Sequence, residues 1–146
     1  MAALQSGSVQ AVTLWDPFLA AAESQPGLKN LRDGSGLSNN RTFYLSTARY
    51  ADEHRALLKT FFAELSKVSQ WANAKPAEVA ALLAPQLGIS TQVLEVASER
   101  RNYNAVAITP QIVAEQQKLA DTFQGLGLIP RKLQVAEAVY PASVLP

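Results

Sequence analysis

Trp15 and Asp16 are the residues of this chain whose types and setting best suit a functional role, and that role would be ligand binding. Asp16 is a preferred N-cap, because its carboxylate can accept hydrogen bonds from the unpaired amides of a first helical turn. Pro17 suits the next position, N1, where a missing N–H costs nothing. If a strand precedes the pair, Trp15 lies at its carboxyl end beside a helix N-terminus, where open α/β sheets bind ligands and free amides favour an anion. A core tryptophan on a capped turn is the commoner alternative.

The elements that must position this pair alternate between strand and helix. The apolar run over residues 9–14 predicts a strand covered on both faces, although its periodicity does not exclude a buried helical segment. A short helix is expected over 17–24, an edge strand over 28–31 and a longer strand over 41–47. The first third of the chain therefore indicates an α/β arrangement.

From Thr47 onward the pattern is helical, and Thr47, Ser90 and Thr109 are expected N-caps. In the helix expected over about 55–73, apolar residues recur at spacings of three and four, which predicts an amphipathic helix whose apolar stripe faces a core. Phe61, Phe62 and Trp71 fall on or near that stripe, so they are interpreted as core residues. The expected helices cover about 47–53, 55–73, a segment from Pro76 that Pro85 kinks or ends, 91–99 and 110–124, with a last turn over 135–140.

Composition excludes several classes of function. The chain has 146 residues, which fits one domain, and a formal net charge of +1, with lysines and arginines too scattered to form a nucleic-acid-binding stripe. It contains no cysteine, which removes disulfides, thiol catalysis and thiolate metal sites. No apolar stretch reaches the roughly 18 residues of a transmembrane helix, and the first residues lack the pattern of an export signal.

No catalytic or metal-binding set is apparent. The single histidine, His54, lies between Glu53 and Arg55 and is expected to be solvated. No HExxH, EF-hand or GxSxG motif occurs, and the Gly-Ser-Gly at 34–36 lacks the further residues of a phosphate loop. We therefore expect no enzymatic activity, no cofactor and no metal.

The order of motifs resembles the periplasmic substrate-binding proteins of ABC importers for aliphatic sulfonates, in the group that includes taurine- and nitrate-binding proteins. The segment from Gly7 to Phe18 is similar to the family's Gly-x-Val-Asp-Ala and Trp-Asp-Pro-Tyr/Phe pattern, with Gln10 where the family commonly has Asp. The resemblance covers essentially the whole chain. Its further motifs are Leu31-Arg-Asp-Gly-Ser-Gly-Leu, Arg41-Thr-Phe-Tyr-Leu, Tyr50-Ala-Asp-Glu-His, Trp71-Ala-Asn, Arg100-Arg101 with Ile108-Thr-Pro, Gln116-Gln117, Asp121-Thr-Phe and Leu128-Ile-Pro-Arg-Lys.

This resemblance implies the C-terminal portion of a two-lobed periplasmic-binding-protein fold of type II, α/β in class and rich in helix. Residues 1–45 would be the end of the second lobe and its return strand, and residues 46–146 would complete the first lobe. Much of the ligand site would then belong to an N-terminal segment of the same protein that precedes this chain. By resemblance, Trp15 and Asp16 lie at the ligand cleft, and Arg41, Thr42 and Tyr44 lie on the connecting strand near it. Arg100–Arg101 could also serve an anion, although arginines at helix ends are usually surface residues.

The implied function is that of a solute-binding component, located in the periplasm, which would bind an alkanesulfonate or related small anion and deliver it to a membrane permease. We expect the chain alone to bind alkanesulfonates weakly or not at all. A second possibility is a self-standing helical interaction module that dimerises to cover its unpaired strands. A third is an enzyme of a related fold that acts on pyrimidine-type molecules, for which the sequence offers only His54.

Overall fold

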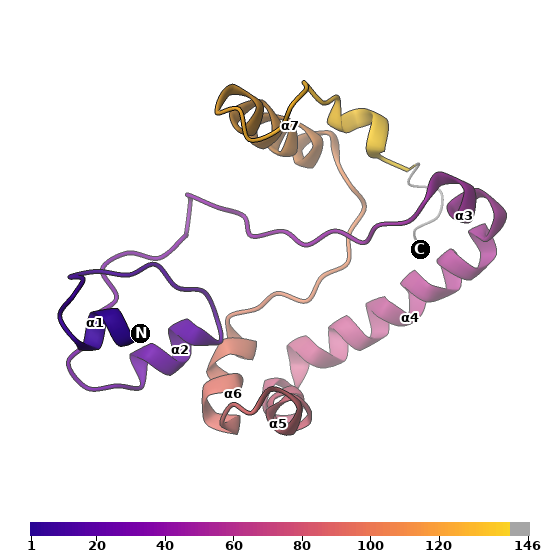
Figure 1. Ribbon diagram of the computed structural model, residues 1–146. Helices are drawn as coiled ribbons and strands as arrows, with labels where there is room; N and C mark the ends of the chain where they lie inside the picture. The colour runs from indigo at the N-terminus through magenta and orange to yellow at the C-terminus, as the bar shows by residue number, and fades with distance from the viewer. Residues whose placement is uncertain (141–146) are drawn as a thin grey trace. The chain divides into compact units, whose positions relative to one another are not determined.

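The computed structural model describes residues 1–140 (Figure 1). Within that range the chain is rich in helix, as expected from the sequence. The regular elements are α1 (Ala2–Gln5), α2 (Phe18–Glu23), α3 (Ala48–Glu53), α4 (Arg55–Ala74), α5 (Pro76–Leu87), α6 (Thr91–Glu99), α7 (Pro110–Gly125) and the 3-10 helix η1 (Val135–Ala138). No helix among the described residues is both long and apolar enough to cross a membrane.

The three predicted strands do not form within residues 1–140. The segments 9–14, 28–31 and 41–47 have neither helical nor strand structure, and apolar side chains on them are exposed, with Leu31 at 83% and Leu45 at 91%. A strand needs a partner strand for its backbone hydrogen bonds, whereas the sequence pattern reports only the preference for extended backbone. The strand predictions were therefore wrong for these segments.

The described residues divide into two compact units that interleave along the chain. The first unit combines Met1–Phe43 with Val68–Asn104, and the second combines Tyr44–Lys67 with residues 105–140. The expected division into 1–45 and 46–146 refers to the lobes of a larger fold and stays a prediction, and its last six residues lie outside the described range.

Close packing of α5 against α6 forms the centre of the first unit (Figure 1). Ala80 is fully buried, and Leu94 and Ala97 are almost so. Small side chains such as those of Ala80 and Ala97 allow two helices to approach closely. Gly88 makes the turn between them in the left-handed conformation, with φ of 66°, which only glycine adopts without cost. The helix continues through Pro85 to Leu87, so Pro85 does not end it.

The side-chain amide of Asn73 makes a further contact within the same unit. Asn73 Nδ2 donates to the Tyr103 carbonyl at 2.9 Å, and Asn73 Oδ1 accepts from the Tyr103 amide at 2.8 Å. The amide therefore pairs with both backbone groups of one residue, as a neighbouring strand would. These two bonds attach the irregular segment after α6 to the end of α4.

The predicted caps of three helices are confirmed. Thr47, Ser90 and Thr109 each accept a hydrogen bond from the amide three residues on, at 3.2, 3.4 and 3.3 Å. Each bond satisfies an amide that has no partner within its helix, which fixes where the helix begins.

In the second unit, the apolar stripe of α4 is only partly covered. Leu57 and Phe61 are 54% and 46% exposed, whereas the sequence pattern predicted that the stripe faces a core. Tyr44 packs edge-on against Phe61 and Phe62, with ring centroids 6.0 and 5.9 Å apart. Periodicity identifies the apolar face of a helix, but the element that covers that face is a separate matter.

A pair of leucines tests which packing holds the first unit together. Leu94→Ala removes a side chain that is 3% exposed, and we expect it to lower the free energy of unfolding by about 2–3 kcal/mol. Leu82→Ala is the matched control, because Leu82 lies on α5 and is 58% exposed, so its effect should stay within about 0.5 kcal/mol. Urea unfolding followed by circular dichroism measures both free energies, and equal effects would contradict the close packing of Leu94 between the helices.

Candidate functional site

The turn that carries Trp15 and Asp16 leads directly into α2. The Trp15 carbonyl accepts a hydrogen bond from the Leu19 amide at 3.1 Å, which anchors its backbone to the first turn of the helix. Its indole, in contrast, is 70% exposed. Trp15 thus presents a large apolar surface from a fixed backbone position, which differs from the alternative of a core tryptophan.

Asp16 accepts a hydrogen bond from the first turn of α2, as predicted, but it is not the N-cap residue. Its Oδ1 accepts from the Ala20 amide at 3.0 Å, and its side chain is only 16% exposed. The helix begins at Phe18, so Pro17 occupies the N-cap position and not N1 as predicted. The amide that was expected to favour a bound anion is therefore occupied by the chain's own carboxylate.

Arg100 joins both ends of α2 to the end of α6. Its Nη1 lies 3.4 Å from Asp16 Oδ1, and its Nη2 donates to Glu23 Oε2. The hydrogen bond with Glu23 raises the pKa of Arg100 above its usual value, partial burial opposes this, and the charge of Asp16 adds to the rise. From the sequence, Arg100 is only a possible anion contact, because no pattern links it to Glu23 and Asp16, which lie 77 and 84 positions away.

The other three expected site residues lie in different settings. Arg41 and Thr42 are exposed, on a segment without regular structure in the first unit. Tyr44 belongs to the second unit, where its ring is 57% exposed and contacts Phe61 and Phe62. Trp15 and Asp16 are therefore the part of the expected site whose geometry is defined, and the roles of Arg41, Thr42 and Tyr44 stay predictions.

His54 has the setting expected from the sequence. It is exposed at the end of α3, and its ring lies against Tyr50 with centroids 4.4 Å apart. Among residues 1–140, no group of three or more histidine, cysteine or acidic side chains is arranged to hold a metal ion.

A second polar cluster, not anticipated from the sequence, joins Asp52 of α3 and Arg55 of α4 to Tyr140 within the second unit. The Tyr140 hydroxyl donates to Asp52 Oδ1 at 2.7 Å, and Arg55 Nη2 donates to the same oxygen at 2.7 Å. Two hydrogen bonds lower the pKa of Asp52, the larger effect coming from Tyr140 and the smaller from Arg55. The bond between Tyr140 and Asp52 also raises the pKa of Tyr140. Arg55 also lies over the Tyr140 ring, 5.8 Å from its centroid.

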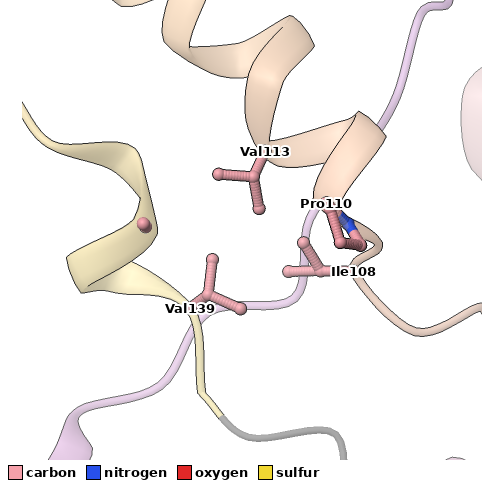
Figure 2. A pocket seen from close by; sticks show the side chains of 5 residues that line it. Ile108, Pro110, Val113 and Val139 are labelled. Carbon is pink, nitrogen blue, oxygen red and sulfur yellow. The ribbon is translucent and has the colours of Figure 1, made fainter.

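An open apolar hollow of about 430 Å³ lies between α7 and η1 in the second unit. Figure 2 shows Val113 of α7 and Val139, which directly follows η1, pointing toward this space. Ligand sites combine apolar walls with a few polar groups that fix orientation. The side chains that line this hollow are all apolar, so none of them can hydrogen-bond to a sulfonate. Its lining residues are Ile108, Pro110, Val113, Ala136 and Val139.

Comparison with known proteins finds no matching family model. Among curated proteins, the chain is 29% identical over 145 residues to an aliphatic sulfonates-binding protein of Escherichia coli (strain K12), covering 99% of this chain and 46% of that protein. It is 25% identical over 138 residues to a protein of the same description from Bacillus subtilis (strain 168), covering 94% of this chain and 42% of that protein. The chain thus spans about half the length of the curated relatives it matches.

Solved structures agree with the sequence matches. The periplasmic aliphatic sulphonate binding protein SsuA from Escherichia coli superposes with a TM-score of 0.84 at 28% identity, over 96% of this chain and 46% of that one. The alkanesulfonate-binding protein SsuA from Xanthomonas axonopodis pv. citri, bound to MOPS, gives a TM-score of 0.78 at 28% identity, over 95% and 48%.

These matches define the class of protein first: the chain has the fold of part of a periplasmic binding protein. Within that class, it is similar to the aliphatic sulfonate-binding proteins, which confirms the resemblance found in its motifs. The relatives are described as binding proteins, which supports the prediction that the chain is not an enzyme.

The Asp52 cluster gives a prediction about pH. Because the folded state lowers the pKa of Asp52, the contact stabilises the protein above the ordinary pKa of aspartate and loses this effect as the pH falls through the lowered value. Tyr140→Phe should therefore raise the pKa of Asp52 toward its ordinary value, measured by carbon NMR titration of the carboxylate. The stability difference from the wild type should be largest at neutral pH and vanish in acid.

Tyr50→Phe is the matched control for this prediction, since it also removes one phenolic hydroxyl, two residues from Asp52 in the sequence. It keeps the ring that lies against His54. We expect it to leave the pKa of Asp52 unchanged. An equal shift in both variants would show that Tyr140 does not set the ionisation of Asp52.

Proposed function

We propose that this chain is part of the solute-binding component of an ABC importer for aliphatic sulfonates and works in the periplasm. The observation that carries the proposal is the agreement of two comparisons: sequence and fold both match sulfonate-binding proteins along almost the entire chain. The proposed ligand is an alkanesulfonate or a related small anion, and the proposed partner in the membrane is the importer's permease.

Physical chemistry supports a role for the Trp15 turn in this function. An alkanesulfonate needs hydrogen-bond donors for its oxygens and an apolar wall for its alkyl tail. The exposed indole of Trp15 supplies a wall, and the side chains of Arg41 and Thr42 carry donors. Tyr44 offers both a ring and a hydroxyl. Asp16 carries the same sign of charge as the ligand, so its contribution would be to hold the turn.

Capture by a periplasmic binding protein depends on two lobes that close around the ligand and exclude water. The chain spans about half the length of its relatives, so we propose that a complementary N-terminal segment of the same protein supplies the remaining contacts. On this view the family function belongs to the two parts together.

Calorimetry on the 146-residue chain alone tests whether its contacts suffice. We expect ethanesulfonate to bind more weakly than the micromolar range or to give no measurable heat, because donors from the complementary segment are absent. Micromolar binding to the isolated chain would show that the site is complete within these residues.

A chimera tests the proposed function directly. In it, this chain replaces the part of the Escherichia coli sulfonate-binding protein to which it aligns. We expect the chimera to bind ethanesulfonate, and Trp15→Ala to weaken binding about tenfold or more, because a buried aromatic wall contributes on the order of 1.5–3 kcal/mol.

Leu31→Ala is the control in the chimera, since Leu31 is 83% exposed and lies outside the proposed site. It should leave the affinity unchanged. A folded chimera without sulfonate binding would contradict the proposed function, and an unchanged affinity in Trp15→Ala would contradict the role of the indole.

A self-standing module that dimerises is the second candidate, and the half-exposed stripe of α4 favours it. Apolar surface of this kind is covered in stable proteins by a partner. Size-exclusion chromatography with light scattering discriminates between the two: a discrete dimer of the isolated chain would favour the module, and polydisperse aggregate would favour the half-protein.

A further inference from the structure

Arg100 is the charged residue whose place near the Trp15 turn the proposed function leaves unexplained. A guanidinium beside a sulfonate site would ordinarily be assigned to the anion itself. In this structure its two terminal nitrogens face Asp16 and Glu23 of its own chain. Two carboxylates surround one guanidinium, so the local charge does not attract an anion to Arg100.

The geometry shows what these contacts do. Asp16 precedes α2 and Glu23 is its last residue; the helix has only six residues and would not persist alone. Arg100 ends α6, and α2 packs against α6 with Ala20 and Ala22 buried. One side chain therefore fixes both ends of a short helix onto a longer one.

The fixed helix in turn fixes the Trp15 turn. Asp16 Oδ1 accepts from Arg100 and also from the Ala20 amide, and the Trp15 carbonyl accepts from the Leu19 amide. A change at Arg100 would thus reach Trp15 through a single shared oxygen and one helical turn. No part of this path requires Arg100 to touch a ligand.

We infer that Arg100 is a positioning residue for ligand binding: it holds the Asp16 carboxylate so that α2 presents the Trp15 indole in one orientation. This inference rests on the proposed function for its biological meaning. Its structural content, the order of the Trp15 turn, can be measured without any ligand.

The ligand-free test uses the full chain with Trp71→Phe, so that Trp15 is the single tryptophan. We expect Arg100→Met to lower the fluorescence anisotropy of Trp15 and to increase its quenching by iodide, with circular dichroism unchanged. Arg49→Met is the control, because it removes the same charge and also breaks an Arg–Glu pair, that of Arg49 with Glu53 at 2.9 Å. Unchanged Trp15 anisotropy in Arg100→Met would overturn the inference.

The second test measures ethanesulfonate affinity in the chimera. If Arg100 acts through Asp16, Arg100→Met and Asp16→Asn should each weaken binding about tenfold, and the double variant should be no weaker than either. Asp16→Asn keeps an oxygen for the Ala20 amide and removes the charge that pairs with Arg100. A double variant whose loss of affinity equals the product of the two single losses would overturn the inference.

Glu23→Gln distinguishes positioning from direct contact with the anion. It frees part of the guanidinium with almost no change of shape, so it also serves if Arg100→Met fails to fold. Positioning predicts unchanged or weaker binding. Tighter binding would assign Arg100 to the ligand and overturn the inference. A wild-type chimera that does not bind sulfonate would instead contradict the proposed function, and the anisotropy result would still decide the role of Arg100.

Discussion

The close contact between α5 and α6 is the constraint on which the first unit depends. Ala80 has no exposed surface, and Leu94 and Ala97 have almost none, so the two helix backbones approach as closely as their side chains allow. This pair gives α2 a surface to pack against, and it places the end of α6 where Arg100 can reach two carboxylates. The turn that carries Trp15 is thus organised by packing that lies entirely outside it.

Local chemistry was readable from the sequence, and pairing between distant segments was not. Thr47, Ser90 and Thr109 were predicted as caps because the cap and its amide lie three residues apart. The extended segments were predicted as strands because β-branched and aromatic residues prefer extended backbone, yet a strand also needs a partner, which residues 1–140 do not supply. The hydrogen bond of Asp16 to the first turn of α2 could be predicted because its partners are close in sequence. Its contact with Arg100 could not, because the two residues are far apart in sequence.

The relation to sulfonate-binding proteins gives meaning to an uncommon combination at one turn. Trp15 is held firmly by its backbone while its indole is open to solvent. Fixing the backbone that carries an exposed aromatic ring lowers the conformational entropy that is lost when a ligand binds to the ring. On the proposed function, Trp15 would contact the ligand. Asp16, beside it, has the wrong sign of charge to attract an anion, and it holds the turn through the Ala20 amide.

The side-chain amide of Asn73 affects which positions of this chain can accept substitutions during evolution. Its two hydrogen bonds go to the backbone of residue 103 and not to the tyrosine side chain. Nearly any amino acid except proline offers the same N–H and C=O, so these bonds place no demand on the identity of residue 103. Position 73 has no such freedom, because even aspartate lacks the donor. One contact therefore joins a position that can vary to a position that cannot.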